Sequence, residues 1–136
     1  MTLQPGKHDL RKALWEREDK CCWYCTRKTR LYCQENAGDR ATIDHLIPKC
    51  RGGVDDDTNR VNCCLRCNGL KGLLTEAEFR SMSSVDALRF NDAAGRYGIK
   101  NLRIIHIAMA AGEGYRPGRA PISLNPDRHE LAKAAE

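Results

Sequence analysis

Two pairs of cysteines, each separated by two residues, constrain the fold of this chain more than any other feature. The pairs are Cys22 with Cys25 and Cys64 with Cys67. A Cys-x-x-Cys pair bends the backbone so that two thiolates face one ion, and two such pairs supply the tetrahedral sulfur set that zinc prefers. Because 38 residues separate Cys25 from Cys64, the intervening segment must fold outward and return. We therefore predict one structural zinc site that closes this excursion.

Other uses of the cysteines fit the sequence less well. Eight cysteines in 136 residues could form a disulfide scaffold, but the N-terminal sequence MTLQPGKHDLRK has no apolar stretch after its charges. Cys-x-x-Cys spacing without an export signal is more typical of metal or redox chemistry, and a redox site needs only one pair. No run approaches membrane-spanning length, so we expect a cytoplasmic protein. The remaining cysteines have irregular spacing, and we interpret them as buried small side chains or loop thiols rather than a second zinc site: Cys21, Cys33, Cys50 and Cys63.

Periodicity, capping signals and breakers divide the chain into short elements. They predict an amphipathic helix at 7–20, a β-branched strand at 41–47 that Pro48 ends, a return strand at 60–63, a short helix from Asn68, a helix opened by a capping box at 75–78 and ending near 82, and a helix at 84–97 capped by Ser84. The pattern at 99–111 does not decide between helix and strand. Accordingly, we divide the chain into an N-terminal helix (1–20), a core with the cysteine pairs (21–82), a helical extension (83–111) and an extended basic tail (112–136).

The segment from Cys22 to Gly72 resembles the HNH endonuclease family, in its branch with four zinc-binding cysteines. The resemblance covers a little over a third of the chain and rests on CWYC, ATIDHLIPKCRGG, Asn59 and CLRCNGLKG, which match jointly and in order. It implies an α+β fold with a ββα-metal (HNH/His-Me finger) core, stapled by a four-cysteine zinc site and flanked by helices. In that fold a hairpin and the following helix form one divalent-metal site that cuts phosphodiester bonds.

The residue types suit such a reaction. A histidine titrates near neutrality, so His45 can take a proton from water as general base, and the resemblance makes it the first letter of the motif. Its neighbour Asp44 offers a hard oxygen ligand from the opposite face of the predicted strand. Asn68, where the family has His or Asn, offers a carbonyl oxygen to the same cation, and oxygen ligands favour Mg²⁺ or Mn²⁺. Asn59, the middle letter, is expected to tie the loop and orient His45, although Asp-Thr-Asn is also a common turn or cap.

DNA is the partner that the resemblance implies, and the net charge of +5 permits an anionic ligand. The flanking basic residues are candidate phosphate contacts: Lys49, Arg51, Arg66 and Lys71. We interpret the acidic run at 55–57 as a solvated loop. The sequence thus predicts a metal-dependent DNA endonuclease that nicks one strand, or cuts both strands as a homodimer. A larger phage or restriction complex is a further context that the sequence leaves open. The alternative is a zinc-stapled nucleic-acid-binding module without catalysis.

Overall fold

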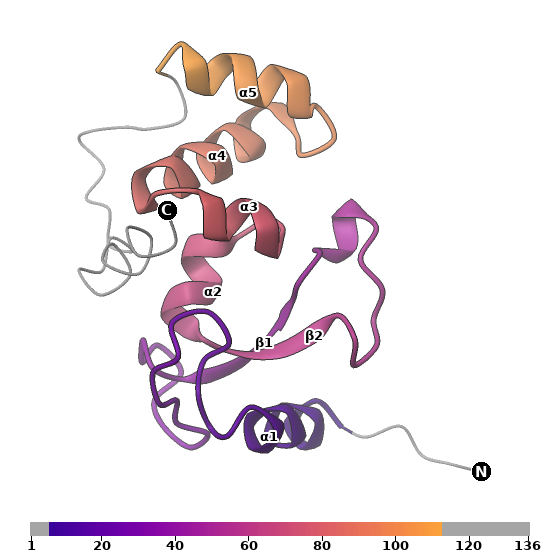
Figure 1. Ribbon diagram of the computed structural model, residues 1–136, viewed down its shortest axis with the longest axis vertical. Coiled ribbons are helices and arrows are strands. Elements are labelled where there is room, and N and C mark those ends of the chain that lie inside the picture. The colour runs from indigo at the N-terminus through magenta and orange to yellow at the C-terminus, as the bar shows by residue number, and fades with distance from the viewer. Residues whose placement is uncertain (1–5, 113–136) are drawn as a thin grey trace.

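A computed structural model describes residues 6–112 of the chain, so the predicted basic tail lies outside the described residues except for Gly112 (Figure 1). The fold is a small α+β arrangement with a two-stranded antiparallel sheet and several helices. This confirms the expected fold class at the level of α+β with a four-cysteine cluster.

The hairpin of β1 (Ala41–His45) and β2 (Arg60–Cys64) lies at the centre of the fold. Asp44 pairs with Val61 and His45 pairs with Arg60 across the ladder. Successive side chains of a strand point to opposite faces of a sheet. Asp44 and His45 therefore leave β1 on opposite sides, as the sequence suggested.

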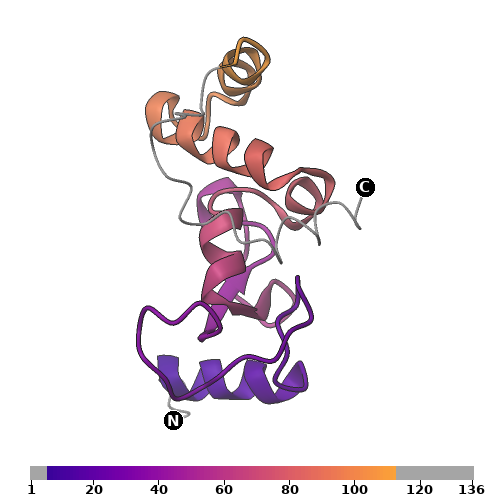
Figure 2. The ribbon, with the colours of Figure 1, turned by 90° about the vertical axis from the view of Figure 1, so that its left-hand side faces the viewer.

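Two helices cover the two faces of the hairpin. The first, α1 (Lys7–Arg17), lies on one side, and α2 (Leu65–Lys71) lies on the other (Figures 1 and 2). Helix α1 buries Leu14, and Arg11 donates a hydrogen bond to the carbonyl oxygen of Ala41. Helix α2 starts directly after β2, three residues before the predicted start at Asn68, because Cys64 acts as its N-cap with a sulfur that accepts from the amide of Cys67.

The C-terminal helices form a further layer on the far side of α2. They are α3 (Glu76–Ser81), α4 (Ser84–Tyr97) and α5 (Leu102–Ala110). Thr75 and Glu78 form the predicted capping box, with each side chain bonded to the other residue's backbone amide. The cap of α4 is Ser83 rather than Ser84, whose backbone is already helical and whose side chain is buried. Residues 99–111, which the pattern did not decide, are mostly helical.

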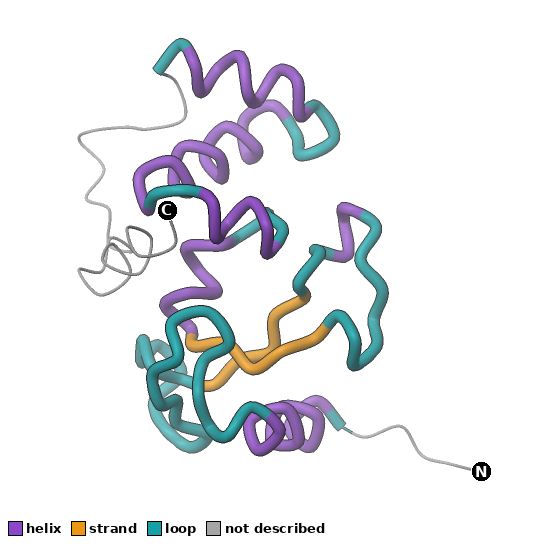
Figure 3. Tube along the Cα trace, viewed as in Figure 1, coloured by secondary structure: helices purple, strands orange, loops and turns teal. Residues whose placement is uncertain are grey.

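The loop between β1 and β2 spans residues 46–59 and leaves the hairpin as one excursion (Figure 3). It contains a single 3-10 turn, η1 (Lys49–Arg51), which follows Pro48. The buried core lies on the α2 side of the hairpin and includes Cys22, Cys64 and Cys67 together with apolar residues from α2 to α5, and the partly buried Cys25 packs against it. The core therefore supports the α2 face of β1, where Asp44 lies.

Candidate active site and metal centre

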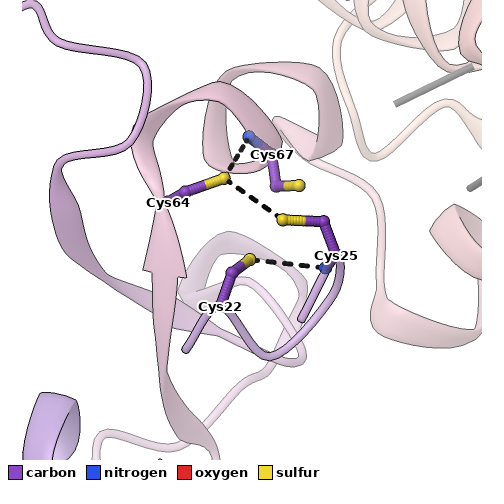
Figure 4. A group of neighbouring side chains, drawn as sticks. All are labelled: Cys22, Cys25, Cys64 and Cys67. Atoms are coloured by element: carbon purple, nitrogen blue, oxygen red, sulfur yellow. Dashed lines mark hydrogen bonds between the residues drawn. The ribbon is translucent and has the colours of Figure 1, made fainter. Parts of the chain in front are cut away.

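The four paired cysteines meet at one point: Cys22 and Cys25 come from the segment before β1, and Cys64 and Cys67 come from the junction of β2 with α2 (Figure 4). All four sulfur atoms lie within 4.8 Å of one another, and the sulfurs of Cys25 and Cys64 are 3.8 Å apart. A tetrahedral zinc with Zn–S bonds of about 2.3 Å has sulfur–sulfur edges of about 3.8 Å. The cluster therefore fits a zinc ion in chemistry and in size.

Backbone amides donate to two of the four sulfurs in this cluster. The amides of Tyr24 and Cys25 donate to the Cys22 sulfur at 3.4 and 3.5 Å, and the Cys67 amide donates to the Cys64 sulfur at 3.3 Å. Hydrogen bonds with Cys25 and three other nearby cysteines lower the pKa of the Cys22 thiol far below its ordinary value. The thiolate, which is the form that binds zinc, is thus stabilised at Cys22, whereas hydrogen bonds with Cys22 and Cys25 raise the pKa of the Cys64 and Cys67 thiols.

The other cysteines do not form a second cluster among residues 6–112. All eight cysteines are free thiols, so the described structure contains no disulfide scaffold. Cys63 is fully buried next to Cys64, and burial raises the pKa of its thiol. It serves as a small core side chain.

Asp44 is a buried carboxylate held by two side chains. Only 6% of the residue is exposed, and the Tyr24 hydroxyl donates to its Oδ2 at 2.6 Å. The Lys71 ammonium lies 3.2 Å from Oδ2 and 3.4 Å from Oδ1. Burial raises the pKa of Asp44, while the charge of Lys71 and the hydrogen bond from Tyr24 oppose that rise.

Lys71 requires a correction to the sequence analysis, which placed it among the DNA contacts. The residue has 0% exposed surface, and its ammonium also donates to the carbonyl oxygen of His45 at 2.8 Å. A lysine enclosed in this way cannot reach a phosphate from its position. Lys71 is an internal partner of Asp44 because α2 packs directly on β1.

Asn68 lies on the same face of α2, one turn before Lys71. Its amide nitrogen donates to Thr42 Oγ1 at 2.9 Å and to the carbonyl oxygen of Ile43 at 3.4 Å. Because a carbonyl only accepts, these contacts fix the amide orientation and leave the Asn68 oxygen as the group available to a cation. Asn68 and Asp44 contact different partners, so the structure does not bring the two predicted ligands together directly.

Asp44 and Asn68 nevertheless suit a hard divalent cation in their chemistry. Both supply oxygen donors from the α2 side of β1, and carboxylate and amide oxygens are the ligands that Mg²⁺ and Mn²⁺ prefer. The Asp44 carboxylate offers about four lone-pair sites. Tyr24 and Lys71 use only part of that capacity, since the Lys71 contact to Oδ1 is 3.4 Å long. A cation at this place would share Asp44 with the Lys71 ammonium.

His45 ends β1 and faces the long loop. Its Nε2 lies 2.9 Å from Asp55 Oδ1, and 22% of its side chain is exposed. Asp55 also pairs with Lys49 at 3.1 Å and with Arg60 at 3.2 Å. The hydrogen bond to His45, followed by that to Lys49, lowers the pKa of Asp55 to about 2. Asp55 is therefore an ionised partner of His45, which the interpretation of 55–57 as a solvated loop did not foresee.

Asn59 ties the two ends of the loop together. Its Oδ1 accepts from the amide of Ile47 at 2.9 Å, and its Nδ2 donates to the carbonyl oxygens of Ile47 and Val54, both at 2.9 Å. The residue is 6% exposed. These contacts hold the loop against the end of β1, although Asn59 makes no hydrogen bond to the His45 ring among the described residues.

The other predicted DNA contacts differ in their exposure and in their ion pairs. Arg51 is largely enclosed, because its guanidinium pairs with Glu78 and only 13% of its side chain is exposed. Lys49 is 59% exposed, although it pairs with Asp55. Arg66 lines an open hollow of about 430 Å³ beside the cysteine cluster, together with Arg27, Lys28 and Asp39.

One family model matches the part of the chain that carries these residues. Residues 22–84 match the family model described as HNH endonuclease. The matched segment belongs to the HNH endonuclease family. This HNH segment contains both cysteine pairs, the hairpin with its loop, α2 and α3. No curated protein and no solved structure matches the chain. Within residues 6–112, the HNH segment and its flanking helices contain no helix long and apolar enough to cross a membrane.

The sequence did not identify two residues of the HNH segment, Tyr24 and Asp55, as parts of the site. Tyr24 appeared only as spacing within the first cysteine pair, and Asp55 only as one of three consecutive acids. Its position between two cysteines does not identify it, because Trp23 lies between the same two cysteines and is 40% exposed. Nothing in the acidic run itself distinguishes Asp55 from Asp56 or Asp57.

Proposed function

We propose that this protein is a metal-dependent HNH endonuclease that hydrolyses phosphodiester bonds of DNA. The observation that carries the proposal is the arrangement of His45 within the family segment. The ring is partly exposed at the end of β1, and its Nε2 faces an ionised carboxylate. A histidine oriented by a carboxylate is a suitable general base.

The order of β1, β2 and α2 supports a ββα-metal core. In this proposal the hairpin presents His45 and Asp44 on its two faces, and α2 adds Asn68. The cysteine cluster holds the structural zinc between the segment before β1 and the start of α2. The zinc-bound cysteines would fix the ends of the unit that carries the chemistry.

The reaction follows from these positions. When the Nε2–H of His45 donates a hydrogen bond to the Asp55 carboxylate, Nδ1 remains to accept a proton from water. The resulting hydroxide attacks phosphorus in line with the leaving 3′ oxygen. Mg²⁺ or Mn²⁺ held by Asp44 and Asn68 would supply stabilisation of charge on that oxygen. Asn59 keeps the loop, and with it Asp55, against His45. The expected products carry 5′-phosphate and 3′-hydroxyl ends.

DNA would contact basic residues at the surface around the site. Lys49 lies next to Asp55 at the His45 end of the loop, and Arg66 lines the hollow with Arg27 and Lys28. Phosphate contacts from lysine and arginine make affinity fall as salt rises. We therefore expect binding of DNA that does not depend strongly on sequence at these positions.

A second function is favoured by one observation. The Asp44 carboxylate is already paired with Lys71, and Asn68 donates its hydrogen bonds to Thr42 and Ile43 instead. A zinc-stapled DNA-binding module without catalysis would show the same pairing. Cleavage by the purified protein separates the two functions.

The test is a plasmid-nicking assay with Mg²⁺ or Mn²⁺, compared with the same assay in a chelator that spares zinc. His45→Ala should lower the cleavage rate by about 10² or more, because loss of a general base acts on the transition state. Zinc content and DNA affinity should stay close to wild type. His8→Ala, an exposed histidine on α1, is the matched control and should cut normally.

Wild-type cleavage by His45→Ala, in a preparation free of contaminating nuclease, would remove His45 from the mechanism. Absence of cleavage by the wild-type protein, with DNA binding retained, would support the binding module instead.

A further inference from the structure

We propose that Tyr24 is a positioning residue that couples the cysteine cluster to the Asp44 carboxylate. The inference rests on the proposed function in one respect, namely that Asp44 is a ligand of the divalent cation. It goes beyond that function because it gives the zinc knuckle, the turn from Cys22 to Cys25, a role at the catalytic site as well as in folding.

Tyr24 belongs to the knuckle by its backbone. It lies between Cys22 and Cys25, and its amide donates to the Cys22 sulfur at 3.4 Å. The preceding residue, Trp23, donates its amide to the carbonyl oxygen of Asn62 on β2 at 2.9 Å. The knuckle thus fixes where the Tyr24 side chain enters the core.

The ring of Tyr24 is fixed on its other sides by α3. It packs edge-on against Phe79, with ring centroids 5.3 Å apart, and the guanidinium of Arg80 lies 5.2 Å from its centroid. The residue is 1% exposed. A ring held in this way has little freedom, so the hydroxyl that donates to Asp44 at 2.6 Å acts as a fixed point.

Lys71 provides the second fixed point for the same carboxylate. It lies on α2, the helix that Cys64 caps and that contains Cys67. Each half of the cysteine cluster therefore reaches Asp44 through its own side chain: the first pair through Tyr24 and the second pair through Lys71. The carboxylate is held between the two segments that the cluster joins.

A consequence follows for the cation site. Partners that orient a metal ligand from outside the coordination sphere affect affinity or activity by about 10- to 100-fold when they are removed. Tyr24→Phe removes one hydroxyl and keeps the ring, so it should leave the packing and the four cysteines intact. The Asp44 carboxylate would then lose one of its two anchors.

The experiment measures Mn²⁺ binding to the full-length, zinc-loaded protein by the loss of the free-ion EPR signal, together with zinc content and cleavage rate. Tyr24→Phe should raise the Mn²⁺ dissociation constant and lower the cleavage rate at fixed Mn²⁺, each by about tenfold. Zinc stoichiometry and DNA affinity should not change. Phe90→Leu is the matched control, because it removes buried ring atoms on α4. It should lower thermal stability without changing the Mn²⁺ constant.

The outcomes separate this inference from the proposed function. A wild-type Mn²⁺ constant and cleavage rate in Tyr24→Phe would overturn the positioning role, while cleavage by the wild-type protein would leave the function standing. Loss of zinc from Tyr24→Phe, or a Mn²⁺ defect shared by Phe90→Leu, would overturn it too by showing a purely structural role. A third outcome is that the wild-type protein cleaves DNA while Asp44→Asn binds Mn²⁺ with the wild-type dissociation constant. Asp44 would then not be a ligand of the cation, and the positioning role of Tyr24 would be wrong although the protein is a nuclease.

Discussion

At the scale of single residues, the charge of Asp44 depends on one lysine. Asp44 and Lys71 are 6% and 0% exposed, so neither charge is solvated by bulk water. A buried ion pair gains little over an apolar pair, but removing one partner leaves the other charge uncompensated and costs about 3–5 kcal/mol. The pair therefore fixes the position of Asp44, and loss of either partner should strongly lower the free energy of unfolding.

Lys71→Met should show this sensitivity with a defined dependence on pH. Burial raises the pKa of Asp44 above its ordinary 3.8, and loss of the ammonium would raise it further. An acid with a raised pKa in the folded state binds a proton on folding, so stability falls as pH rises from its unfolded pKa through its folded pKa. Urea denaturation should therefore show a larger loss of unfolding free energy at pH 8 than at pH 5, up to about 3–5 kcal/mol.

Lys49→Met is the control for that measurement. Its side chain is 59% exposed, and surface pairs such as the one with Asp55 contribute about 0–1 kcal/mol. A Lys71→Met protein as stable as wild type at pH 8 would show that the buried pair does not exist in solution.

At the scale of elements, the 46–59 loop is held by few contacts of high specificity. Asn59 satisfies three backbone groups of the loop, and Gly53 packs so closely that an added Cβ would lie 1.8 Å from the carbonyl oxygen of Ile47. The loop also carries Asp55. The position of Asp55 beside His45 therefore depends on these local contacts.

Asn59→Ala should loosen the loop without affecting the cysteine cluster. Each backbone group left without a partner costs about 1–3 kcal/mol if it stays buried. Amide hydrogen exchange should become faster at Ile47, whose amide donates to the Asn59 side chain, and cleavage should slow. The Leu46 amide, which donates to the Asn59 backbone, is an internal reference. Thr58→Ala in the same loop should change neither, and unchanged exchange at Ile47 in Asn59→Ala would contradict the brace.

The sequence predicted those elements that local signals control. The β-branched run before Pro48 and the Thr75 capping box act within a few residues, so β1 and the start of α3 could be predicted, although β1 ends at His45, two residues before the predicted end. The start of α2 was placed too late, because a cysteine sulfur serves as its cap. The burial of Lys71 could not be foreseen, since lysine is mostly exposed and only the packing of α2 on β1 places Asp44 beside it. Tyr24 was missed for the same reason, because its partner lies on another element.

At the scale of the whole molecule, the cysteine cluster joins two segments that lie far apart in the sequence. The turn with the first cysteine pair and the start of α2 meet at Cys22, Cys25, Cys64 and Cys67, within the same core as Leu70 and Phe79. In small domains a structural zinc supplies much of the folding free energy, because its ligands are not arranged in the unfolded chain. The hairpin and both faces of the proposed active site depend on this junction.

Cys64→Ser should therefore lower zinc content, melting temperature and cleavage together. Serine keeps a side-chain oxygen that can cap α2 at this position, so the expected losses follow from the missing thiolate ligand and not from the cap. Cys50→Ser, a change at an exposed cysteine outside the cluster, is the matched control and should keep all three properties.

Zinc is measured by elemental analysis and stability by thermal denaturation in the presence and absence of a zinc chelator. The chelator should lower the melting temperature of Cys50→Ser as much as that of wild type. It should have little further effect on Cys64→Ser, because that protein has already lost the ion. A Cys64→Ser protein that retained one zinc per chain and its melting temperature would show that the cluster is not the zinc site, and the coupling of the knuckle to Asp44 would lose its basis.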